Sequence, residues 1–235
     1  IALLAMGTGE IATARQLHEE RLALERELDN VGHVAEALTD LGEIALLEAR
    51  LAEAGEYLEE ARTIYEAFDD GESLLRVLAH LGELARRQGD HTLSRSILDR
   101  CLALAHDSRP KEAWVLAQLA RLARAEHDSR EALSRALEAL AIAEEHQLSG
   151  VEAVVLDVAG AVAAGEGDIE TALRLSAAAE ALRSSFLRPV EVEHTVDREI
   201  ALQALGPAGY ERARAEGAAM TASARRQLVR AVQVR

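Results

Sequence analysis

Cysteine, proline and aromatic residues are scarce in this chain of 235 residues. A single cysteine, Cys101, excludes an intramolecular disulfide and a zinc cage built from thiolates. With three prolines and 3% aromatic residues, the chain is dominated by Ala, Leu, Glu and Arg, which lose little side-chain entropy in a helix. The composition therefore favours a helical core over a sheet.

Long apolar runs and positive charge are also lacking. No apolar run approaches the ~20 residues that cross a bilayer, so we expect a cytoplasmic chain without membrane contact. The formal net charge of -15 repels phosphate backbones and argues against nucleic-acid binding by this segment. The chain opens at Ile1 inside a helical pattern, without an initiator methionine or a signal-type region, so we expect a piece of a longer protein.

The chain does contain an internal repeat. A two-residue signature recurs, and its second members are spaced 40, 38 and 40 residues apart. The copies of this signature are Leu41-Gly42, Leu81-Gly82, Leu119-Ala120 and Ala159-Gly160. Seven residues after each second member comes a predicted turn. These turns are Gly89-Asp90, His127-Asp128 and Gly167-Asp168, with Ala49-Arg50 as a departure and Gly9-Glu10 as a partial earlier copy.

Small residues recur at two places after each turn. Such residues let the second helix of a pair approach the first closely, and the Gly of the signature does the same from its side. The first set is Ala14, Ala54, Ser94, Ala132 and Ala172. The second set is Ala61, Cys101, Ala139 and Ala179, with Arg21 as the exception. The pattern therefore describes helix packing.

These residues make the chain resemble the tetratricopeptide repeat family, whose units carry a Leu-Gly pair, a Gly-Asp turn and two later alanines. The resemblance covers roughly residues 1 to 185, with a period longer than the family's usual ~34 residues. It implies an all-α fold, a right-handed α-α superhelix (TPR-like solenoid) of about five helix pairs plus a C-terminal helical cap. The expected units are 1–29, 31–68, 71–106, 110–147 and 150–185, followed by a capping segment at 188–235.

Local signals support these boundaries. Ser149 with Glu152 predicts a capping box, Asp128 with Glu131 imitates one, and Pro110 suits a first helical turn. The period fails after Leu187, and two Pro-containing pairs then predict breaks, at Arg188-Pro189 and Gly206-Pro207.

A second resemblance concerns the end of the chain. The run from Leu175 to Arg183, then Leu205-Gly206, Tyr210 and the run from Glu216 to Met220, are similar to the C-terminal end of bacterial LuxR and AfsR-like regulators. Those are multidomain ATPases of signal transduction and transcription regulation. The resemblance implies that this chain is their repeat arm, a non-catalytic sensor scaffold, and that the ATPase lies outside it.

Motifs for chemistry are absent from the sequence. Gly165-Glu166-Gly167 is not followed by the Lys of a phosphate-binding loop, and the eight histidines form no His-Glu-x-x-His pair. We therefore expect no enzyme, no catalytic residue, no metal and no cofactor. Cys101 is expected to be a buried packing residue, and the acidic pairs Glu59-Glu60 and Glu144-Glu145 are expected at the surface.

Partner binding is expected on the first helix of each pair, which lines the concave surface of such a superhelix. Positions at fixed offsets from the signature Gly then place five arginines in one groove, which favours an acidic ligand. The expected binding residues are Arg76, Glu83, Arg86, Arg87, Trp114, Arg121 and Arg124. The expected partner is a protein or peptide, including other domains of the parent chain.

Three alternatives remain open at this stage. In the first, Arg-Glu pairs across repeats neutralise the arginines, and Trp114 merely packs between helix pairs. In the second, the groove binds an acidic small effector instead of a protein. In the third, the chain is an assembly module that forms a homodimer through its helical edges.

Overall fold

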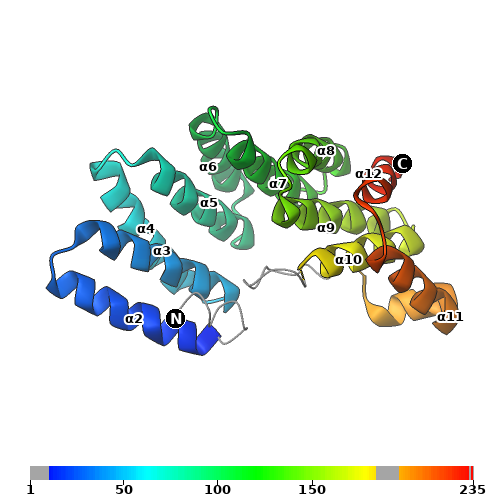
Figure 1. Ribbon diagram of the computed structural model, residues 1–235, viewed down its shortest axis with the longest axis horizontal. Coiled ribbons are helices and arrows are strands. Elements are labelled where there is room, and N and C mark those ends of the chain that lie inside the picture. The colour runs from blue at the N-terminus through cyan, green and yellow to red at the C-terminus, as the bar shows by residue number, and fades with distance from the viewer. Residues whose placement is uncertain (1–10, 184–195, 233, 235) are drawn as a thin grey trace. The chain divides into compact units, whose positions relative to one another are not determined.

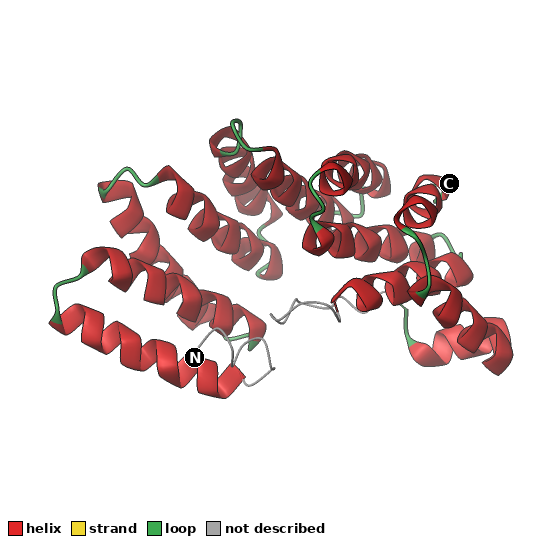
Figure 2. Ribbon diagram, viewed as in Figure 1, coloured by secondary structure: helices red, strands yellow, loops and turns green. Residues whose placement is uncertain are grey.

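The structure, a computed structural model, describes residues 11–183, 196–232 and 234. Every regular element in this part of the chain is an α-helix, as Figure 2 shows in red. The helices are α2 (Ile11–Glu27), α3 (Val31–Leu47), α4 (Leu51–Ala67), α5 (Gly71–Arg87), α6 (His91–Leu104), α7 (Arg109–Ala125), α8 (Ser129–Glu145), α9 (Ser149–Gly165), α10 (Ile169–Arg183), α11 (Arg198–Ala218) and α12 (Ala222–Ala231). The predicted all-α fold class is confirmed. The predicted turn at Gly9-Glu10 and the break at Arg188-Pro189 lie outside the described residues.

These helices form two compact units. The first unit contains α2 to α6 within residues 11–107, and the second contains α7 to α12 within the described residues from 108 onward. Within the first unit consecutive helices from α2 through α6 pack against each other, and within the second unit those from α7 through α11 do so (Figure 1). Each unit therefore stacks consecutive antiparallel helices, as TPR-like solenoids do.

The turns between helices follow one local design. Gly89 and Gly167 have φ values of 81° and 83°, in the left-handed region that glycine tolerates. Ala49 and His127 adopt the same conformation, with φ values of 58° and 62°, so the turn persists where the sequence departs from Gly-Asp. The following Asp128 caps α8 by accepting a hydrogen bond from the Glu131 backbone N–H at 2.9 Å.

One helix start differs from its prediction. Leu148 is the N-cap residue of α9, Ser149 already lies inside the helix, and no side chain caps this end. The predicted capping box is therefore wrong. The side chain of Glu152 is engaged elsewhere, because its Oε1 accepts a hydrogen bond from Arg225 Nε at 2.6 Å.

The helix pairs of the first unit pack where the repeat predicts close approach. A Cβ placed on Gly82 of α5 would lie 3.2 Å from Leu98 Cδ2 of α6. The small residue Ser94 is fully buried, and its Oγ donates a hydrogen bond to the Gly82 carbonyl at 2.8 Å. Ala54 at the equivalent position of the first unit, and Ala132 and Ala172 in the second unit, are fully buried as well. The small-residue pattern thus marks helix contacts, as predicted.

The C-terminal helices complete the second unit. The α11 helix is interrupted at Gly206, whose φ is 67°, and Pro207 follows, so the break predicted there is confirmed. Beyond it, Tyr210 and Ala213 pack with Leu173 of α10. The last helix, α12, lies against α8, α9 and α10 and buries Val229 in their common core.

Candidate partner-binding faces

Four of the predicted binding residues lie on α5 in the first unit. This helix starts with Asp70 as N-cap, whose side chain accepts a hydrogen bond from the Ser73 backbone N–H. Its apolar face is buried, with Val77 and Leu78 almost fully covered. Arg76, Glu83, Arg86 and Arg87 are all partly exposed. We refer to these four residues as the α5 face.

Glu83 binds two of the arginines of the α5 face. Its Oε2 accepts a hydrogen bond from Arg86 Nε at 2.9 Å, and its Oε1 accepts one from Arg87 Nε at 2.6 Å. The side chains of Glu83 and Arg86 are only 11% and 12% exposed, so this charge cluster is shielded from water more than an ordinary surface pair. One carboxylate thus binds both guanidinium groups and fixes their positions on the helix.

Arg87 has a second, structural contact. Its Nη1 donates a hydrogen bond to the backbone carbonyl of Leu46 at 2.7 Å. Leu46 belongs to the last turn of α3, where carbonyl groups lack intrahelical partners and the helix dipole favours a cation. Arg87 therefore ties the end of α3 to the end of α5, and Leu46 itself is buried.

Arg76 is held by a carboxylate that the sequence reasoning missed. Its Nη1 lies 3.2 Å from Asp40 Oδ1 of α3. His18 Nδ1 and Arg21 Nη1 of α2 approach the other oxygen of Asp40 at 3.4 and 3.5 Å. Asp40 lies between the buried Leu38 and Leu41, and an acidic residue on a buried helix face is the signal that predicts such partners.

The other three predicted residues lie on α7 in the second unit, and we refer to them as the α7 face. Trp114 is half-buried and packs against the core of its own unit. Arg121 is 8% exposed, and its Nη1 donates a hydrogen bond to Gln118 Oε1 at 3.1 Å. Arg124 is partly exposed near the end of the helix. Pro110 lies in the first turn of α7, as predicted.

Metal-ligand clusters, membrane-length helices and the one thiol are the remaining features of the described residues that bear on function. No group of three or more His, Cys, Asp or Glu side chains within them is arranged to hold a metal ion. None of the helices in this part of the chain is both long and apolar enough to cross a membrane. Cys101 is fully buried, as predicted, and burial raises the pKa of its thiol to about 12, so it is not a thiolate nucleophile near neutral pH.

Stacked helix pairs, Gly- and Ala-mediated packing and Asp-capped turns define the class of α-helical repeat proteins. The profile of the tetratricopeptide repeat family matches residues 73–145, which run from α5 to α8. The chain is similar in fold to the crystal structure of BtubC (BKLC) from P. vanneervenii, with a TM-score of 0.55 and 20% sequence identity. The similarity covers 96% of this chain and 91% of that chain. No curated protein matches in sequence.

Proposed function

We propose that this chain is a protein-interaction scaffold that binds acidic segments of a partner protein through its α5 and α7 faces. The observation that carries the proposal is the tetratricopeptide repeat match, because repeats of this family mediate protein contacts. The matched residues, 73–145, contain all seven residues of the two faces.

The charges of the two faces support an acidic ligand. Together the two faces contain five arginines on a chain with a net charge of -15, and Glu83 is their only acidic residue. Four of these arginines are partly exposed, whereas Arg121 is buried. Arg76 is 41% exposed, and its contact with Asp40 holds the guanidinium in place without burying it. A planar guanidinium donates two parallel hydrogen bonds to a carboxylate, and a positioned arginine loses less entropy on binding.

We further infer the setting of this scaffold. The sequences of α10 and α11 resemble the end of LuxR and AfsR-like regulators, which favours a cytoplasmic arm of a bacterial transcription regulator. In that setting the acidic segment belongs to another domain of the same parent chain, and its binding or release biases the regulator between two states.

Trp114, the only tryptophan of the chain, serves as a built-in reporter for testing this function. A glutamate-rich peptide is titrated into the chain, and both tryptophan emission and the anisotropy of a labelled peptide are recorded. We expect saturable binding that weakens as salt is raised. The variant Arg76→Glu, Arg124→Glu should bind at least about tenfold more weakly, which corresponds to about 1.4 kcal/mol.

The matched control is Arg100→Glu, Arg135→Glu. It changes the net charge by the same amount on the second helices α6 and α8 and should leave binding within about twofold. Circular dichroism establishes that both variants remain helical. If both variants lost affinity for the peptide equally, net charge alone would explain the loss. If the unmutated chain did not bind the peptide, an acidic partner would be disproved.

A further inference from the structure

The C-terminal helix α12 depends on the surface beneath it. It has only ten residues, fewer than the ~12–15 that an isolated helix needs to be even marginally stable in water. Its apolar side packs on the core of the second unit, with Val229 fully buried and Leu228 and Val232 partly buried. Its helical state therefore reflects docking onto α8, α9 and α10.

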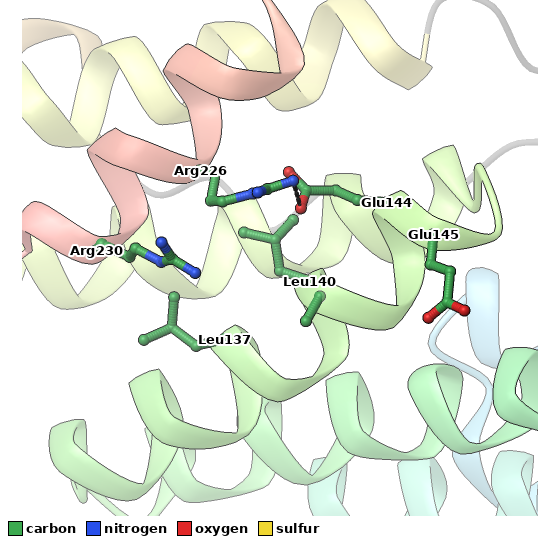
Figure 3. A pocket seen from close by; sticks show the side chains of 7 residues that line it. Leu137, Leu140, Glu144, Glu145, Arg226 and Arg230 are labelled. Atoms are coloured by element: carbon green, nitrogen blue, oxygen red, sulfur yellow. Dashed lines mark ion pairs between the residues drawn. The ribbon is translucent and has the colours of Figure 1, made fainter.

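Two ion pairs attach α12 to this surface. Arg225 Nε donates a hydrogen bond to Glu152 Oε1 of α9 at 2.6 Å, and these side chains are only 14% and 10% exposed. Arg226 pairs with Glu144 of α8, and Figure 3 shows these two side chains directed toward each other. The prediction that Glu144 is a solvated surface residue is thus wrong, because α12 covers it.

The charges of the two partners are complementary. The α12 helix carries three arginines and no acidic residue. The surface beneath it carries Glu144 and Glu145 at the end of α8 and Glu152 in the first turn of α9. Carboxylates this close to an apolar surface are costly without cations, so the surface selects basic helices over neutral or acidic ones.

The fit of α12 is nevertheless incomplete. A cavity of about 340 Å³ remains between α8 and α12, lined by Leu137, Leu140, Ala141, Glu144, Glu145, Arg226 and Arg230 (Figure 3). Arg230 is exposed and forms no ion pair with the described residues. Glu144 Oε1 is buried and accepts no hydrogen bond from them. A helix with larger apolar side chains and another donor would satisfy this surface better than α12 does.

We propose that this surface, formed by Leu137, Leu140, Glu144, Glu145 and Glu152, is a docking site for a basic amphipathic helix of a partner protein. In the chain alone α12 occupies it as a tethered, displaceable ligand. The partner helix carries two adjacent arginines and an apolar residue one turn later, as Arg225, Arg226 and Val229 do in α12. This site is distinct from the α5 and α7 faces and selects the opposite charge.

The experiment uses the full chain and a fluorescent peptide with the sequence of residues 219–235 as the probe. Wild-type chain should bind the peptide weakly, because the tethered α12 competes at a high effective concentration. The variant Arg225→Glu, Arg226→Glu should release its own α12 and bind the peptide at least about tenfold more tightly than wild type. Hydrogen exchange over residues 222–231 reports the release.

Three further variants make the result specific. Glu144→Arg, Glu152→Arg should release α12 and also fail to bind the peptide. Arg130→Glu, Arg135→Glu changes the net charge in the same direction and by the same amount as Arg225→Glu, Arg226→Glu. Both of its residues lie on α8 outside the cavity lining, so it should behave as wild type. Arg225→Gln, Arg226→Gln removes the ion pairs without adding negative charge. It replaces Arg225→Glu, Arg226→Glu if circular dichroism shows that the glutamate variant is unfolded.

Several outcomes would overturn the proposal. One is continued protection of residues 222–231 in the folded Arg225 and Arg226 variants, which would mean that the ion pairs do not hold α12. Another is release of α12 without a gain in peptide binding, or equal peptide binding by the Glu144→Arg, Glu152→Arg variant. A wild-type dimer in light scattering, with α12 still protected, would make a second copy the occupant instead of a partner protein.

Discussion

Gly42 of α3 faces Leu58 of α4 so closely that a Cβ on Gly42 would lie 2.5 Å from Leu58 Cδ2 and 2.6 Å from Leu58 Cγ. Leu58 is fully buried and cannot move aside without disturbing the core. Gly42→Ala should therefore lower the free energy of unfolding by about 1–3 kcal/mol through overpacking. Gly32→Ala in the same helix meets nothing within 4 Å and should be neutral or stabilising by up to about 1 kcal/mol. Urea unfolding of both variants tests this difference. Equal changes in the free energy of unfolding would contradict the prediction.

Asp157 and Arg183 form a buried ion pair between α9 and α10. The two hydrogen bonds are 2.6 and 3.1 Å long, and the side chains are 6% and 9% exposed. Arg183→Met should lower the free energy of unfolding by about 3–5 kcal/mol, because it removes the guanidinium that binds both oxygens of a buried carboxylate. The double variant Asp157→Leu, Arg183→Met should recover much of this loss. Chemical denaturation measures both, and a double variant no more stable than the single one would refute the explanation.

Cys101 should be inert in the folded chain. Its Sγ lies 3.9 Å from the Leu75 carbonyl in a fully buried position, and burial raises its pKa to about 12. A thiol reagent at pH 8 should therefore react only at the rate at which the chain opens, and rapidly in urea. Fast labelling of the native chain would contradict this expectation.

The same pKa predicts a pH dependence of stability. The unfolded thiol loses its proton near pH ~8.5, whereas the folded thiol keeps it until the pH reaches about 12. The contribution of Cys101 is therefore fully present below pH ~8.5 and declines as the pH rises through this window. Unfolding of Cys101→Ala should lack this decline when compared with wild type, and parallel curves would contradict the assigned cause.

Equivalent repeat positions in the first unit carry inverted ion pairs. Arg26 of α2 contacts Glu60 of α4 at 2.7 Å, while Glu66 of α4 contacts Arg100 of α6 at 3.1 Å. Glu66 lies 40 residues after Arg26, and Arg100 lies 40 residues after Glu60, so each position carries the opposite charge in the next repeat. In a double-mutant cycle, Glu66→Arg should lower the free energy of unfolding, and Glu66→Arg, Arg100→Glu should recover the part that is due to Arg100. The part due to Arg62, which also pairs with Glu66, should stay lost. The coupling should be about 0.2–1 kcal/mol and should fade at high salt, since these side chains are well exposed. If no coupling energy were measured at low salt, the Glu66–Arg100 ion pair would not contribute to stability.

Local features were predictable from the sequence because their partners are near in the chain. Asp128 caps α8 through a backbone N–H only three residues away, and the small residues that recur every 38 or 40 residues mark where paired helices touch. The prediction for Ser149 fails because Leu148 is the N-cap residue and Ser149 already lies inside α9. The partner that Glu152 binds instead, Arg225, lies 73 residues further on. Similarly, Asp40 binds Arg76 across 36 residues. Nothing in the local pattern names such distant partners.

The sequence by itself determined that the chain is helical, where the turns within its helix pairs lie and which small residues face a paired helix, because helix propensity, turn conformation and apolar period are properties of neighbouring residues. Only the tertiary structure decided which charges meet. It placed Arg76 against Asp40, put Arg87 on the end of α3, and laid α12 over Glu144 and Glu152. Many charge pairings are compatible with one helical pattern, and the stacking of the helices selects among them.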